Sequence, residues 1–170
     1  MTINPFDLIE CSKNMPLRQN NADLDLSVYT WQVSFVWLVS GLINTDNDLQ
    51  KIVCTLNSVD YDNEIGFGNW QEWIVNTEFK EISMAQINDN ITQMIDEINE
   101  KIKENSANSF IYHTMLFVLN KIRQSNNKQA FCLIPLKTKP NCPNRLTGHY
   151  YHYIILDNDD CYYLAHNQES

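Results

Sequence analysis

The strongest hydrophobic pattern in the chain lies between residues 83 and 104. Apolar side chains recur there every three or four positions, and the opposite positions carry Asp, Asn, Glu and Lys, which is the pattern of an amphipathic helix. Ser83 and Gln86 form a capping box at its start. We predict an exposed helix to about Glu104 whose apolar stripe packs on the protein's own core. The stripe consists of Met84, Ile87, Ile91, Met94 and Ile98.

Weaker helical patterns follow the same three-to-four spacing elsewhere in the chain. They predict helices over residues 45–57, 70–74 and 109–124, the last of them more deeply buried. Residues 1–27 are polar and rich in Asn, and we predict a short helix or turn there, followed by a loop.

Residues 31–43 are apolar on every side, which is typical of a buried central element. A helix is the favoured interpretation, and Asp25 or Ser27 could cap it. The β-branched residues of the segment leave a strand as the alternative.

The C-terminal part of the chain changes from helical spacing to alternation interrupted by turn residues. Residues 129–136 are predicted to form a strand. Residues 149–156 and 161–165 are predicted to form a hairpin that turns at Asn158-Asp159.

These elements predict the α+β class. The architecture would be a helical N-terminal body of about five helices followed by a small antiparallel C-terminal sheet, with a hairpin at residues 149–165. Because no linker or repeat divides the chain, residues 1–170 are predicted to form one domain.

The charge of the chain narrows the classes of partner. Its 21 acidic residues outnumber its 12 basic ones, for a net charge of −9. Such a charge disfavours nucleic acid and anionic membranes, both of which are bound through Lys and Arg. It favours a cationic protein partner, through steering and complementarity.

Several classes of protein are disfavoured by the sequence. The five cysteines show no paired spacing, which is typical of reduced intracellular thiols. The N-terminus lacks the pattern of a signal peptide, and residues 31–43 are too short to span a bilayer. We also find no metal cage, phosphate loop, nucleophile elbow or dinucleotide fingerprint. We therefore predict a cytoplasmic protein without enzymatic activity, metal or cofactor.

An acidic segment rich in aromatic residues, predicted to be a loop leading into a short helix, is the candidate binding site. Aromatic side chains anchor interfaces, and carboxylates can meet Lys or Arg of a partner. The alternative is that its tryptophans belong to the core and its acids are merely solvated. The predicted partner-binding residues are Asp60, Asp62, Glu64, Phe67, Trp70, Glu72 and Trp73.

A cysteine hydrolase is the main alternative function. Cys11 precedes His149 and His152, and Asp157 or Asn158 follows them. This order resembles that of papain-like and NlpC-like peptidases, which implies a Cys11 thiolate activated by one of the two imidazoles. The local motifs of those families are absent around Cys11.

Two further groupings have structural interpretations that we favour. A metal could be held by residues near the C-terminus, but residues three apart on a strand face opposite sides. Tyrosines of the predicted hairpin could stack on bases, although the acidity of the chain and cross-strand packing argue against this. The metal candidates are His149, His152, Cys161 and His166.

The function we predict is binding of another protein without catalysis. In size, acidity and lack of a catalytic motif, the chain resembles the immunity proteins of contact-dependent growth inhibition. The resemblance is one of type and not of matched residues. It implies a bacterial inhibitor that neutralises a basic toxin, such as a nuclease domain, by covering its active-site groove. An effector-type adaptor that binds a host protein through residues 84–104 is a further alternative.

Overall fold

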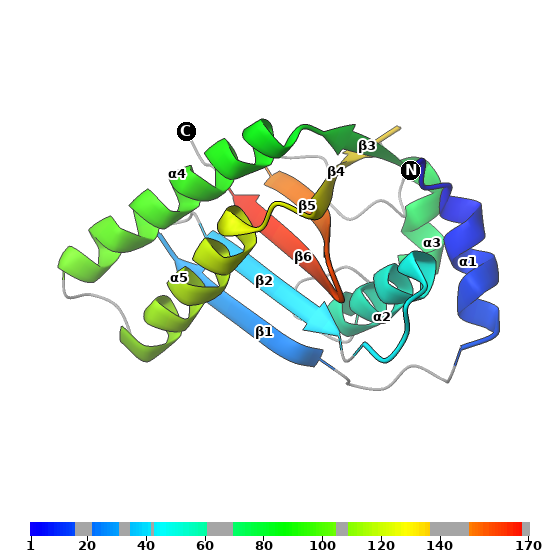
Figure 1. The fold of residues 1–170 in the computed structure, drawn as a ribbon, viewed down its shortest axis with the longest axis horizontal. Helices are drawn as coiled ribbons and strands as arrows, with labels where there is room; N and C mark the ends of the chain where they lie inside the picture. Colours follow the sequence, from blue (N-terminus) through cyan, green and yellow to red (C-terminus); the bar gives the residue numbers. More distant parts are fainter. Residues whose placement is uncertain are drawn as a thin grey trace.

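In the part of the chain that it describes, the computed structural model contains a six-stranded antiparallel sheet with helices on both faces (Figure 1). The strand order is β1-β2-β6-β5-β4-β3, so β1 and β3 form the two edges. The strands are β1 (Ala22–Tyr29), β2 (Phe35–Gly41), β3 (Thr77–Ile82), β4 (Lys128–Pro135), β5 (Tyr150–Asp157) and β6 (Asp160–Asn167). The structure describes residues 1–15, 22–30, 35–41, 43–60, 70–104, 109–136 and 150–167.

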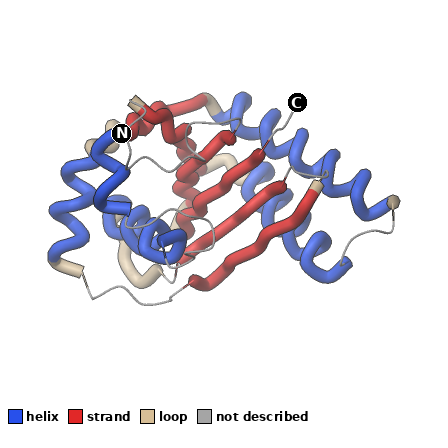
Figure 2. The backbone as a smooth tube through the Cα atoms, turned by 180° about the vertical axis from the view of Figure 1, so that it is seen from behind, coloured by secondary structure: helices blue, strands red, loops and turns tan. Residues whose placement is uncertain are grey.

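Two groups of helices cover the sheet (Figures 1 and 2). Each group packs against its own hydrophobic cluster. One group is α1 (Pro5–Lys13), α2 (Asp48–Asp60) and α3 (Trp70–Trp73), which a 3-10 turn at Ile74–Asn76 connects to β3. The other group is α4 (Met84–Lys103) and α5 (Ser109–Gln124). The sheet is therefore the middle layer of three, and its central strands are buried on both faces.

The α+β class, the five α-helices of the described residues and the C-terminal hairpin agree with the prediction. Helix α4 begins where the capping box predicts, because Ser83 Oγ accepts from the backbone N–H of Gln86 at 3.1 Å. The hairpin of β5 and β6 turns at Asn158, whose φ of 54° lies in the left-handed region that Asn tolerates.

The favoured helix over residues 31–43 is wrong, since residues 35–41 form strand β2. Trp37 and Val39 pack in the cluster beneath α1–α3, whereas Val36 and Leu38 pack beneath α4 and α5. A strand with helices on both faces is apolar at every position and loses the alternation by which strands are recognised. The strand alternative was the correct one.

Two edge strands were not predicted. Residues 22–29 form β1 where a loop was expected, so neither Asp25 nor Ser27 is a helix cap. Residues 77–82 form β3, the opposite edge. No helix in the described part of the chain has the length and apolar character needed to span a membrane.

Candidate interaction surfaces

The acidic segment predicted to bind a partner is described in part. Asp60 is the last residue of α2, and the structure describes Glu72 as exposed in α3. The prediction of binding also includes residues outside the described ranges, namely Asp62, Glu64 and Phe67. Binding by this segment stays a prediction.

The two tryptophans of the segment belong to the core. Trp70 and Trp73 are fully buried in the cluster beneath α1–α3. The indole N–H of Trp70 donates to Asn57 Oδ1 at 2.8 Å, which ties α3 to α2. This burial agrees with the alternative in which the tryptophans fill the core, and it leaves Glu72 as the solvent-facing side chain among these three residues.

Among the described residues, Cys11 has no neighbour that would activate a catalytic thiol. Its Sγ makes a hydrogen bond of 4.0 Å to Met15 Sδ, and no hydrogen bond joins it to a histidine within the described ranges. Burial raises the pKa of the Cys11 thiol. An activated nucleophile requires the opposite shift, which a neighbouring cation or helix N-terminus would supply.

Two of the histidines proposed as metal ligands, His152 and His166, lie on different faces of the sheet. His152 pairs with Tyr163 Oη in the layer of α1–α3, whereas His166 Nε2 lies 2.9 Å from Glu97 Oε2 of α4. Cys161 is fully buried, and burial raises the pKa of its thiol to about 12. His149 lies outside the described residues. Within the described ranges, no group of three or more His, Cys, Asp and Glu side chains could hold a metal ion.

The edge strand β1 carries a row of acidic and polar side chains. Leu24, Leu26 and Val28 pack toward α4 and α5. The side chains at the alternating positions Asp25, Ser27 and Tyr29 are exposed, and that of Tyr29 is 62% exposed. Asp23, which is also exposed, lies at a bulge in the same strand.

Two hydrogen bonds hold this row in place. The indole N–H of Trp37 donates to Asp25 Oδ1 at 2.7 Å, and the hydroxyl of Tyr112 donates to the backbone carbonyl of Tyr29 at 2.7 Å. A partner would therefore meet an acidic and aromatic surface whose geometry is already set. We call Asp23, Asp25, Ser27 and Tyr29 the β1 row. The alternation in Asp23-Leu24-Asp25-Leu26-Ser27-Val28-Tyr29 is the signal that could have identified it.

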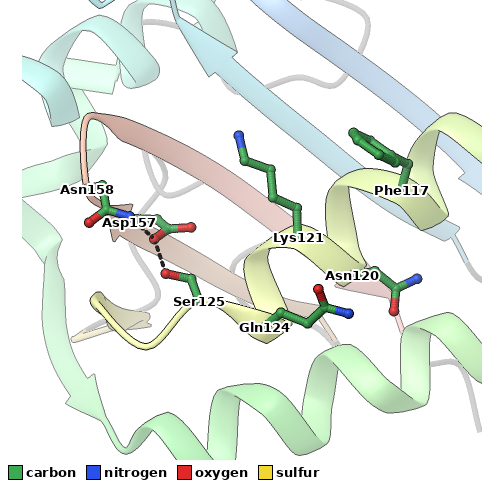
Figure 3. Close-up of a pocket in the computed structure, with 7 residues that line it drawn as sticks. All are labelled: Phe117, Asn120, Lys121, Gln124, Ser125, Asp157 and Asn158. Carbon is green, nitrogen blue, oxygen red and sulfur yellow. Dashed lines mark hydrogen bonds between the residues drawn. The ribbon is translucent and has the colours of Figure 1, made fainter.

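A second surface is an open hollow of about 650 Å³ between α5 and the turn that joins β5 to β6 (Figure 3). Phe117 borders it and is 72% exposed. Lys121 forms an exposed ion pair with Asp160 at 3.3 Å, and Ser125 Oγ donates to Asp157 Oδ1. The exposed charges of this hollow are largely paired with one another. It offers a partner less uncompensated charge than the β1 row does.

No protein-family model, curated protein or solved structure matches the chain.

Proposed function

We propose that the protein binds and inhibits a basic protein, without catalysing a reaction. The inhibitor would be bacterial and of the immunity type, and its partner would be a toxin domain with a cationic substrate groove. The net charge of −9 supports a partner of opposite sign.

The observation that carries this proposal is the β1 row. Interfaces combine aromatic anchors with polar groups at their rim. Tyr29 supplies a largely exposed aromatic ring, and Asp23 and Asp25 supply carboxylates on the same edge strand. An edge strand also offers backbone N–H and C=O groups along its outer side.

Inhibition would result from occlusion. The acidic surface steers a cationic partner into an encounter complex, and the complex then covers the groove that the partner uses for its own substrate. Attraction between exposed charges is screened by salt, so association should slow as ionic strength rises.

The test is capture of partners from lysate of the source organism at low and high salt, with the wild type and with Asp23→Asn/Asp25→Asn. We expect a basic protein that is retained at low salt and captured less by the double variant. The matched control is Asp46→Asn/Asp159→Asn, which removes the same charge from exposed positions elsewhere. Co-expression should then suppress the toxicity of the captured protein.

The acidic segment at residues 60–73 is tested in the same assay by Asp60→Asn/Asp62→Asn/Glu64→Gln. Weaker capture would assign that segment to the interface together with the β1 row. Full capture by both sets of variants would contradict acidic recognition. Capture of a basic protein whose activity is unchanged in the complex would contradict inhibition.

A further inference from the structure

A polar pocket of about 310 Å³ lies between α4 and the sheet, on the face opposite to Asp25. One flank of α4 lines it with three carboxamides, Gln86, Asn90 and Gln93, which share a side of the helix because they are four and three residues apart. Asn90 Nδ2 donates to Tyr153 Oη at 2.8 Å, which fixes that amide. Within the described ranges, the side-chain amide of Gln86 makes no hydrogen bond.

The sheet supplies an aromatic surface to the same pocket. The rings of Tyr151 and Tyr153 are parallel to within 6°, with their centroids 6.5 Å apart. Tyr153 is buried beside Cys132 of β4, its partner in the ladder, whereas Tyr151 is 47% exposed. A half-exposed ring held against a second ring is a platform on which a flat ligand can stack.

The charges around the pocket favour a neutral ligand. Among the described residues that line it there is no Asp, Glu, Lys or Arg. The neighbouring carboxylate of Glu97 already accepts from Gln93 Nε2 at 3.3 Å and lies 2.9 Å from His166 Nε2. Among the described residues, a ligand with a formal charge would find no unpaired counter-charge there.

We propose that this pocket binds a neutral nucleobase or nucleoside with an adenine-type edge. A carboxamide presents a donor and an acceptor side by side, which match the N6 amino group and N7 of adenine. The base would stack on Tyr151 and bond to Gln86, and the small volume suits a ligand of this size. This inference is independent of the proposed function, since the pocket and the β1 row lie on opposite faces of the sheet.

The test is a titration of the whole protein with adenosine. Binding is detected through the side-chain amide signals of Asn and Gln in NMR spectra. We expect saturable shifts and weaker binding of ATP, because the protein carries a net charge of −9. Gln86→Ala and Tyr151→Ala should each weaken binding roughly tenfold. Tyr151→Phe should retain it, and Gln124→Ala, an exposed glutamine on α5, serves as the control.

Three results would overturn the inference. Adenosine at millimolar concentration could fail to produce saturable shifts. Glucose, a neutral ligand without a flat ring, could bind more tightly than adenosine. Finally, adenosine binding could be unchanged in both Gln86→Ala and Tyr151→Ala, whose side chains are at the rim of the pocket and can be removed without opening the core.

Discussion

Glu97 Oε2 lies 2.9 Å from His166 Nε2, and this pair connects the middle of α4 to the end of β6. The two side chains are only 17% and 3% exposed. Because β6 is a central strand, the pair fixes how far α4 can slide along the sheet. It therefore also sets the position of the carboxamides that line the pocket beside it.

The pair should make the stability of the protein depend on pH through Glu97. Burial alone would raise the pKa of Glu97. The hydrogen bond and charge of His166, together with hydrogen bonds from Gln93 and Thr30, outweigh this effect, so the pKa is lowered. A lowered carboxyl pKa stabilises the fold above the ordinary value of about 4.3, and this contribution disappears as pH falls through the folded-state value. Glu97→Gln should remove this contribution and lower the free energy of unfolding by about 1–3 kcal/mol at neutral pH.

Urea unfolding between neutral and acidic pH measures this effect. Asp96→Asn is the matched control, since Asp96 is the neighbouring acid and is exposed. The control should keep the wild-type pH profile, whereas the profile of Glu97→Gln should be flatter. Parallel profiles for the wild type and Glu97→Gln would show that Glu97 does not carry the dependence.

Gly41 allows β2 to approach α2 closely. A Cβ at this position would lie 2.7 Å from the backbone oxygen of Cys54 and 3.1 Å from Ser58 Oγ. Backbone cannot move aside as a flexible side chain can, so Gly41→Ala should destabilise the protein by about 1–3 kcal/mol. Thermal unfolding followed by circular dichroism measures this. The control is Ser27→Ala on the exposed row of β1, which should change stability by less than about 0.5 kcal/mol. Equal midpoints of thermal unfolding for Gly41→Ala and Ser27→Ala would contradict the close approach of β2 to α2.

The elements that could be predicted from the sequence include those with one apolar and one polar face and those with a marked start or turn. Helix α4 has an apolar and a polar face, and the capping box at Ser83 marks its start. The β5–β6 hairpin is marked by Asn158, a residue suited to a positive φ. Strand β2 has no polar face, so periodicity could not separate it from a buried helix. That distinction depends on the helices packed on both faces, which are distant in sequence.

The surfaces were harder to predict than the elements. Composition does not distinguish a core aromatic residue from an exposed one. The sequence therefore predicts the tryptophans at positions 70 and 73 in a binding segment, although both are buried. The carboxamides at 86, 90 and 93 belong to the polar face of α4. Only the rotation of that helix on the sheet turns them toward Tyr151. The β1 row does have a local signal in the sequence, the alternation of residues 23–29.

Substitutions at buried and at exposed residues of α3 should have clearly different effects on the stability of the protein. Trp70→Ala removes a fully buried indole and its hydrogen bond to Asn57, and should cost about 3–5 kcal/mol. Glu72→Gln, two residues away and exposed, should change stability by less than about 0.5 kcal/mol. Urea unfolding followed by circular dichroism compares them without depending on tryptophan fluorescence. A small effect of Trp70→Ala would contradict its place in the core.

The stability of the turn between β5 and β6 should depend on whether residue 158 tolerates a positive φ, more than on the chemistry of its side chain. Asn158 adopts a φ of 54°, and its carbonyl accepts from the buried Lys51 Nζ at 3.0 Å, which holds the turn against α2. A β-branched residue is strained at this φ, so Asn158→Val should destabilise the protein by about 1–2 kcal/mol. Asn158→Gly tolerates the conformation and keeps the carbonyl, and should stay within about 0.5 kcal/mol of the wild type.

Thermal unfolding of both variants measures the difference, with Asp159→Ala as the control at the next exposed turn position. Equal losses in the Val and Gly variants would mean that the Asn158 side chain, which donates to Asp157 Oδ1 at 3.3 Å, stabilises the turn instead.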